Sequence, residues 1–159
     1  MTSQPRNSAG SPDLEISVIV PVMNEAGNIR PLIDEICDAF KGRRFEVIYV
    51  DDASTDDGPA ELATAAAEIP QLRVLRHEKR AGQSAAIRSA LMVAHGHLIG
   101  VLDGDGQNVP ADLPNLEAVL NKAVADGKGP VGMAAGIRAR RKDRLRKYDS
   151  HSDTSHLAG

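Results

Sequence analysis

Short apolar runs rich in β-branched residues alternate with amphipathic stretches along most of this 159-residue chain. The runs at residues 16–21, 45–50, 72–75 and 97–102 predict four buried strands, and residues 131–137 predict a fifth. Strands that alternate with helices over short links form parallel sheets covered on both sides. The alternation therefore predicts an α/β fold, an open and mainly parallel sheet with helices on both faces.

The stretches between these strands have helical spacing. Apolar residues between positions 29 and 40 recur at i, i+3, i+4 and i+7, which predicts an amphipathic helix. An Ala-rich helix is expected to follow Asp56 or Asp57, either of which is a suitable cap. Two more helices are expected at residues 84–94 and 113–123.

Composition argues against three classes of protein. The single cysteine argues against a disulfide scaffold or a zinc cluster, and no apolar run reaches the roughly 20 residues of a membrane-spanning helix. The first 13 residues lack the apolar stretch of a signal peptide, so we expect a cytoplasmic protein. We expect residues 1–14 to form a disordered leader, residues 15–137 one domain, and residues 138–159 a basic segment with an unstructured tail.

Ligands of open parallel sheets bind beyond the carboxyl ends of the strands, near a switch in strand order. The residues that follow each predicted strand are therefore candidates for a site. Polar and charged clusters follow the first four predicted strands, at residues 24–28, 51–57, 77–83 and 103–108. Because these clusters would meet at one edge of the sheet, together they predict a binding site better than any one of them alone.

The fourth cluster has the clearest chemistry. Asp103 and Asp105 are two residues apart in an extended segment, so their carboxylates point the same way. Gly104 between them leaves room for a bulky anion. With the amide oxygen of Gln107 as a third ligand, the cluster suits a hard cation such as Mg²⁺, which would bridge to a diphosphate and neutralise a leaving group. The alternative is an ordinary polar Asp-Gly turn.

The second and first clusters each have two interpretations. Asp51, Asp52 and Ser54 are placed to accept hydrogen bonds from ribose hydroxyls or from a base. Alternatively, they form an Asx turn before a helix, with Asp51 orienting the loop. Asn24 and Glu25 either contribute to the same site or cap the helix that follows them.

Basic residues occur in two places of interest. Lys79 and Arg80 either meet phosphates or form a solvated turn. All Lys and Arg residues of the last 22 positions lie between Arg138 and Lys147, whereas the chain as a whole is acidic. This basic segment either holds a diphosphate through Arg138, lies on an anionic membrane surface, or binds nucleic acid nonspecifically. The lack of interleaved aromatic residues argues against nucleic acid.

Three motifs taken together resemble the family 2 glycosyltransferases with the GT-A fold, in particular the polyprenyl-phosphate sugar transferases of the dolichol-phosphate mannosyltransferase type. The motifs are Pro21-Val-Met-Asn24-Glu25, Val50-Asp-Asp-Ala-Ser-Thr-Asp-Asp57 and Asp103-Gly-Asp-Gly-Gln107. The segment that starts at Gly82 and Gln83 is similar to the opening of the family's third helix. Gly136-Ile-Arg138 and Arg141-Lys-Asp-Arg144 are similar to two later family elements, so the resemblance runs from about residue 16 to residue 147.

The resemblance implies a nucleotide-sugar donor, UDP- or GDP-linked, and a metal. It implies that Pro21, Asn24, Glu25 and Asp52 line the nucleoside pocket, that Asp103, Asp105 and Gln107 hold Mg²⁺ or Mn²⁺, and that Arg138 contacts phosphate. Asp51, Ser54, Gly82, Gln83 and Gly104 are expected to belong to the same donor site.

The reaction implied is transfer of the sugar to a polyprenyl (dolichol or undecaprenyl) phosphate, with Asp103 and Asp105 catalytic through the metal. Since the second pKa of a phosphate monoester is about 6, this acceptor is already anionic at neutral pH and needs little help from a general base.

Two alternatives to an active transferase follow from the sequence. Family members continue well past this length and the polar tail at residues 148–159 is unlike their continuation, so the chain is either an active transferase or a truncated, catalytically incomplete nucleotide-binding fragment. A dinucleotide-binding oxidoreductase is disfavoured, because no G-x-G-x-x-G follows the first predicted strand. We expect no nucleic-acid partner, and peripheral membrane contact through residues 138–147.

Overall fold

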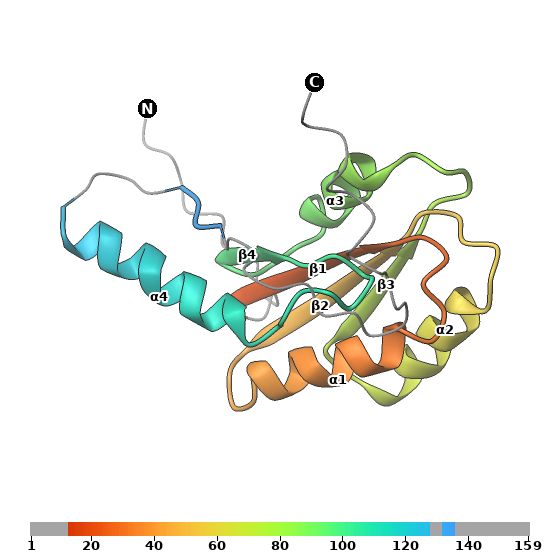
Figure 1. Cartoon of the computed structure of the whole chain (residues 1–159), viewed down its shortest axis with the longest axis horizontal. Helices are drawn as coiled ribbons and strands as arrows, with labels where there is room; N and C mark the ends of the chain where they lie inside the picture. The colour runs from red at the N-terminus through yellow and green to blue at the C-terminus, as the bar shows by residue number, and fades with distance from the viewer. Residues whose placement is uncertain (1–12, 128–131, 136–159) are drawn as a thin grey trace, which may run out of the picture.

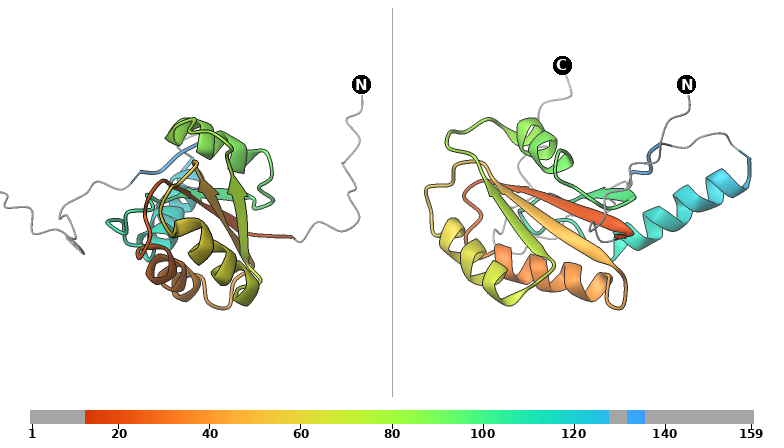
Figure 2. Two further views of the ribbon diagram at one scale, coloured as in Figure 1. Left: turned by 90° about the vertical axis from the view of Figure 1, so that its right-hand side faces the viewer. Right: turned by 180° about the vertical axis from the view of Figure 1, so that it is seen from behind.

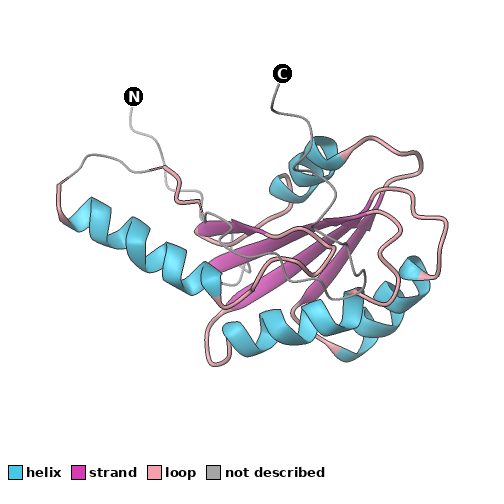
Figure 3. Cartoon of the chain, viewed as in Figure 1, coloured by secondary structure: helices cyan, strands magenta, loops and turns pink. Residues whose placement is uncertain are grey.

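The structure is a computed structural model that describes residues 13–127 and 132–135 (Figure 1). Its elements are β1 (Ile16–Val22), α1 (Ile29–Ala39), β2 (Phe45–Asp51), α2 (Gly58–Glu68), β3 (Leu72–Arg76), α3 (Gln83–Leu91), β4 (Leu98–Val101) and α4 (Asp112–Ala125). Strands and helices alternate throughout, as predicted (Figure 3). Of the predicted fifth strand, residues 132–135 are not in a strand, and the rest of it lies outside the described residues, as does the basic segment.

The four strands form one parallel sheet in the order β3-β2-β1-β4. The chain moves outward from β1 to β2 and β3, and then returns to place β4 on the other side of β1. Strand order therefore switches at β1, whose Ile16 pairs with Phe45 of β2 and with Leu98 of β4. In a parallel sheet a switch of this kind opens a crevice beyond the strand ends.

Helices cover both faces of the sheet, which confirms the predicted fold class. Successive side chains of a strand point to opposite faces, so Val18 and Val20 of β1 pack with α1 and α2, whereas Ile19 packs with α3. Figure 2 shows α3 on one side of the sheet and α1 and α2 on the other.

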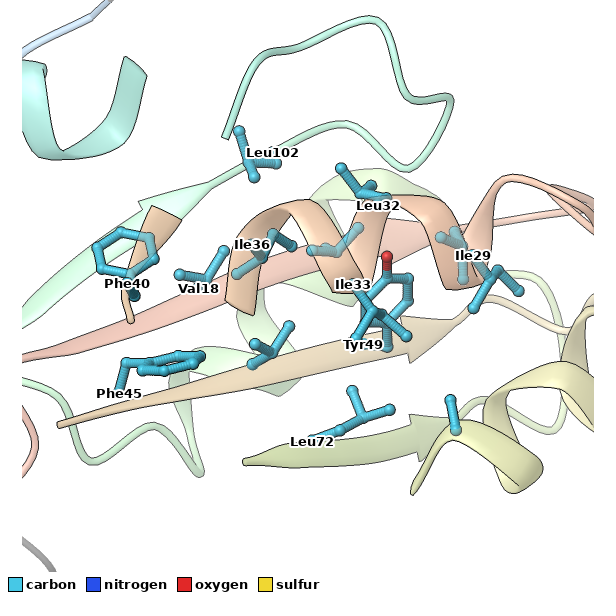
Figure 4. Packing of buried hydrophobic residues seen from close by; sticks show 14 of the residues in the cluster. Val18, Ile29, Leu32, Ile33, Ile36, Phe40, Phe45, Tyr49, Leu72 and Leu102 are labelled. Atoms are coloured by element: carbon cyan, nitrogen blue, oxygen red, sulfur yellow. The ribbon is translucent and has the colours of Figure 1, made fainter. Parts of the chain in front are cut away.

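The larger core cluster lies between the sheet and α1. The predicted period of α1 is confirmed, because Ile29, Leu32, Ile33 and Ile36 are all buried. Figure 4 shows these side chains above the strands, with Tyr49 of β2 among them. The hydroxyl group of Tyr49 is buried and has no hydrogen-bond partner among the described residues, and burial raises the pKa of this phenol.

The smaller cluster shows why α3 is rich in alanine. Ala86 and Ala90 are completely buried against Ile19, Ile48 and Val50 of the sheet. Small side chains let the helix backbone approach the strands closely, and this position brings the start of α3 to the carboxyl edge of the sheet.

Helix α4 is covered only in part by the rest of the described residues. Of its apolar residues only Leu113 is buried, and Val119 is 60% exposed. Glu117 holds the helix in place by a two-pronged ion pair with Arg43, with oxygen–nitrogen distances of 2.7 and 3.0 Å. No described helix combines the length and the apolar character that a membrane span requires.

A buried polar network closes the amino end of the sheet. Glu46 accepts hydrogen bonds from the Ser17 hydroxyl (2.6 Å), the His95 backbone N–H (2.7 Å) and Arg73 (2.8 Å). Burial alone would raise the pKa of Glu46, but these donors outweigh it and hold that pKa below its ordinary value. The network fixes the turn between α3 and β4 at the opposite end from the strand carboxyl termini.

Candidate functional site

A cleft of about 370 Å³ lies at the carboxyl edge of the sheet. Its walls come from the segments that follow all four strands, so the structure brings the four polar clusters together as expected. The predicted site residues that line this cleft are Pro21, Glu25, Asp52, Gly82, Gln83, Asp103, Gly104 and Asp105. Asn24, Asp51, Ser54 and Gln107 do not line it, and Arg138 lies outside the described residues.

Asp103 and Asp105 both line the cleft and are both half-buried. Asp103 accepts a hydrogen bond of 3.0 Å from the side-chain amide of Gln83 at the start of α3. Asp105 accepts a bond of 3.0 Å from the backbone N–H of Gln107, which closes a tight turn. Within the described residues no cluster of three His, Cys, Asp or Glu side chains forms a ready-made metal site, so a cation here would also need donors from its ligand or from water.

Gly104 is required for the packing of this segment. A methyl group on its Cα would lie 2.3 Å from Cγ1 of Val22 and 2.9 Å from the carbonyl oxygen of Pro21. The sequence suggested that glycine leaves room for an anion. The structure gives another reason, which is that the backbone between the two aspartates rests directly on the end of β1.

The loops after β1 and β2 are tied together by Asn24 and Ser54. The backbone N–H of Asn24 donates to the Ser54 hydroxyl at 2.9 Å, and the Asn24 side-chain oxygen accepts from the N–H of Thr55 at 2.8 Å. Asn24 has a φ of 55°, a left-handed conformation that asparagine tolerates better than most residues. Neither Asn24 nor Glu25 is the cap of α1, which begins after Asn28.

Asp51 orients the loop that follows β2, which is the second of the two interpretations given above for this residue. It is 1% exposed, accepts a bond of 2.9 Å from the N–H of Ser54, and forms an ion pair of 3.1 Å with Arg76. Ser54 and Arg76 also line a neighbouring hollow of about 540 Å³ between the loops that follow β2 and β3.

Asp52 holds the loop that follows β3. One carboxylate oxygen accepts from His77 Nδ1 and from the N–H of Ala81, both at 2.8 Å, and the other accepts from the N–H of Gly82 at 2.7 Å. Burial acts to raise the pKa of Asp52, but these bonds hold the pKa below its ordinary value. Asp52 is therefore an ionised carboxylate at neutral pH, with both oxygens engaged.

Sequence reasoning gave no individual role to Glu61 or His77, and it treated Asp56 only as a helix cap. Asp56 does accept from the N–H of Gly58 (2.9 Å), at the start of α2, and it also accepts from the N–H of Ala26 (2.9 Å). Glu61 accepts from the N–H of Gly27. The only signal for these contacts was the presence of acidic residues near predicted loops, which does not identify a partner.

The described part of the cleft is strongly acidic. Glu25, Asp52, Asp103 and Asp105 face a single lining cation, Arg80. A diphosphate alone would be repelled by this excess of carboxylates, whereas a divalent cation would offset it. Carboxylate oxygens are also the donors that Mg²⁺ and Mn²⁺ prefer, so the residues present fit a cation that binds together with an anionic ligand.

A family model and curated relatives both match this chain. The family model described as glycosyl transferase family 2 matches residues 17–156. The dodecaprenyl-phosphate galacturonate synthase of Rhizobium johnstonii is 34% identical over 152 residues, which cover 91% of this chain and 42% of that protein. The chain spans about two fifths of the length of the curated relatives it matches.

Two solved structures share the fold. The mannosyltransferase PcManGT from Pyrobaculum calidifontis, in complex with GDP-Man and Mn²⁺, superposes with a TM-score of 0.54 and 32% identity over 58% of this chain and 28% of that chain. Glucosyl-3-phosphoglycerate synthase from Mycobacterium tuberculosis, in complex with Mn²⁺, UDP and glucosyl-3-phosphoglycerate, superposes with a TM-score of 0.55 and 28% identity over 67% and 39% of the two chains.

Proposed function

Because this chain belongs to glycosyl transferase family 2, we propose that it binds a nucleotide sugar and a divalent cation in the cleft and takes part in transferring the sugar to a polyprenyl phosphate. The family match confirms the resemblance drawn from the three motifs. The observation that carries the proposal is the position of Asp103 and Asp105, which line one acidic cleft where strand order switches between β1 and β4.

The donor set of the cleft supports a metal-dependent mode of binding. Asp103 and Asp105 would hold Mg²⁺ or Mn²⁺, with Gln107 as a further ligand. When bound, the cation would bridge to the diphosphate and neutralise the charge on the leaving nucleoside diphosphate. The complexes of PcManGT with GDP-Man and Mn²⁺ and of the mycobacterial synthase with UDP and Mn²⁺ support this proposal.

The remaining site residues divide into those that line the cleft and those that shape it. Pro21, Glu25 and Arg80 line the cleft and would meet the donor there, and Arg80 is the one cationic side chain among the described residues that line it. Asn24, Asp51 and Ser54 fold the loops after β1 and β2. Gly82 and Gly104 bring backbone to the wall of the cleft, and Gln83 orients Asp103. Arg138 is proposed as a phosphate contact from the resemblance alone.

The proposed acceptor does not depend on a general base in the cleft. A phosphate monoester is already ionised at neutral pH, so its attack on the sugar does not require a side chain to remove a proton. The name of the Rhizobium relative supports a polyprenyl-phosphate acceptor. We further propose that the protein works at the cytoplasmic face of a membrane, with residues 138–147 contacting anionic lipid.

A second candidate function is nucleotide binding without transfer. It is favoured by one observation, that the chain spans about two fifths of the length of its curated relatives. Incubation with labelled nucleotide sugars and a polyprenyl phosphate in membrane extracts separates the two candidates. A lipid-linked sugar supports transfer, and donor binding without such a product supports the second candidate.

Calorimetric titration with UDP and with GDP, each with and without Mn²⁺, tests the donor site itself. We expect one of the nucleotides to bind in a Mn²⁺-dependent manner and Asp105→Asn to lose at least about tenfold in that affinity, as removal of groups around a metal typically costs. Asp126→Asn is the matched control, since Asp126 is exposed at the end of α4 and away from the cleft. Equal affinities of the two variants would remove the metal role from Asp105.

A further inference from the structure

A continuous chain of hydrogen bonds runs from helix α3 to the wall of the cleft. The Ser89 hydroxyl lies 2.9 Å from Nε2 of His77, and Nδ1 of the same ring lies 2.8 Å from the Asp52 carboxylate. Asp52 in turn accepts the backbone N–H groups of Ala81 and Gly82. The loop after β3 is thus held at both ends by groups that meet at one carboxylate.

The chemistry of Asp52 fixes which group donates on its side of the ring. An ionised carboxylate only accepts hydrogen bonds, so Nδ1 of His77 carries the proton that it shares with Asp52. Nε2 on the other side of the ring is within hydrogen-bond distance of the Ser89 hydroxyl, which can either donate or accept. Ser89 therefore holds the ring in the orientation that serves Asp52.

The loop held in this way carries groups that belong to the cleft. Arg80 lies just before the two N–H groups that Asp52 accepts, and it lines the cleft. Gly82 has a φ of 94°, a left-handed conformation that glycine adopts readily. The next residue, Gln83, donates to Asp103. A shift of the loop would move Arg80 and would also disturb the hydrogen bond from Gln83 to Asp103.

We propose that His77 is a positioning residue of the donor site, which fixes Asp52 and through it the loop that presents Arg80 and Gln83 to the nucleotide diphosphate and its metal. This inference rests on the proposed function for the identity of the ligand. It assigns His77 no contact with the donor in the cleft, which His77 does not line, although His77 does line the neighbouring hollow.

The same three residue types also occur in hydrolases as a nucleophile, a base and an orienting acid, but here they serve a different purpose. Ser89 lies within α3 and lines neither the cleft nor the neighbouring hollow. Asp52 also accepts hydrogen bonds from two backbone N–H groups of the loop after β3. The arrangement therefore holds backbone in place rather than activating Ser89.

Two variants of His77 test the proposal in the full chain. His77→Phe keeps a ring of similar shape but removes both nitrogens, whereas His77→Asn offers an amide N–H in place of Nδ1–H. His97→Phe is the matched control, because the side chain of His97 is 76% exposed, close to the amino end of the sheet. The readouts are the affinity for UDP or GDP with Mn²⁺, and the hydrogen-exchange rates of the amides of Ala81 and Gly82.

We expect His77→Phe to lower the nucleotide affinity about tenfold and to speed exchange of both amides, and we expect His77→Asn to bring both readouts most of the way back to those of the unmodified protein. Equal affinity of His77→Phe and His97→Phe would overturn the proposal, and so would failure of His77→Asn to restore it. If His77→Phe does not fold, Ser89→Ala takes its place, and unchanged affinity and exchange in that variant would equally overturn the proposal.

The two proposals fail in different ways. If the unmodified chain binds neither nucleotide with Mn²⁺, the proposed function fails, and exchange alone then decides the role of His77. Unchanged exchange of Ala81 and Gly82 in His77→Phe would overturn the positioning role whatever the ligand is. Faster exchange that His77→Asn reverses would support it.

Discussion

Replacing Gly104 by alanine adds one methyl group between the two aspartates, and the structure defines what that group would meet. The new carbon would lie 2.3 Å from Cγ1 of Val22 and 2.9 Å from the carbonyl oxygen of Pro21. Non-bonded carbon atoms prefer a separation of about 3.5–4.0 Å. Val22 is only 5% exposed and is paired with Asp51 of β2, so the strand cannot move aside freely, and the segment that carries Asp103 and Asp105 must shift instead.

Two opposing contributions set the size of the effect. Forcing an extra carbon into a close-packed site typically costs about 1–3 kcal/mol. Replacing glycine by alanine restricts the unfolded chain, which recovers about 0.4–1 kcal/mol when the backbone conformation is compatible. Gly104 does not have the positive φ that would add strain. We therefore expect the free energy of unfolding to fall by about 1–2 kcal/mol.

Gly132→Ala is the matched control, because a methyl group there meets no atom within 4 Å. Urea unfolding of the two variants beside the unmodified chain measures the difference, and titration with Mn²⁺ and nucleotide measures the effect on the site. We expect only Gly104→Ala to be destabilised and to bind nucleotide more weakly. If Gly104→Ala is as stable as Gly132→Ala, the packing argument is refuted.

Three further outcomes are expected. Tyr49→Phe removes a buried hydroxyl that has no hydrogen-bond partner in the described part of the chain and should raise the free energy of unfolding by about 1 kcal/mol; a lower free energy of unfolding, measured with urea, would contradict this. Asp52 and Glu46 have lowered pKa values in the folded protein, so their stabilisation is complete above about pH 5 and is lost as pH falls through the folded values. Glu46→Gln should therefore be less stable at neutral pH and lose less stability on acidification, whereas an unchanged pH profile would exclude Glu46 as a source. Binding of the chain to anionic vesicles should weaken when salt is raised from a low concentration to about 200 mM, because salt screens the attraction between charges. Salt-independent binding would exclude the electrostatic mode for residues 138–147.

Most of the fold follows from hydrophobic periodicity. The burial of Ile29, Leu32, Ile33 and Ile36 matches the period read from the sequence, and all four described strands lie within a few residues of their predicted bounds. Helix α4 shows the limit of this reasoning. Its apolar spacing predicts that it forms, but periodicity does not reveal how much of that face other parts of the chain cover.

The sequence predicts where the candidate site lies on the sheet, but it does not predict which residues contact one another there. The rule for parallel sheets predicts that polar residues after each strand meet at one edge, and they do. Adjacent carboxylates with similar sequence surroundings nevertheless have different partners, since Asp51 accepts its own loop's N–H and Asp52 accepts two from the loop after β3. Such pairings depend on loop conformation, which residue types alone do not determine.

The position of β1 between β2 and β4 has a consequence for how the molecule assembles. β1 and β2 are close in sequence, whereas β4 pairs with the same strand after a much longer excursion of the chain, so loop-closure entropy favours pairing of β1 with β2 before β4 docks. One wall of the cleft is therefore absent until this last strand docks. A ligand that spans the ends of β1 and β4 would bind only after that step, so an increase in melting temperature on adding nucleotide and metal would report that the last strand is in place.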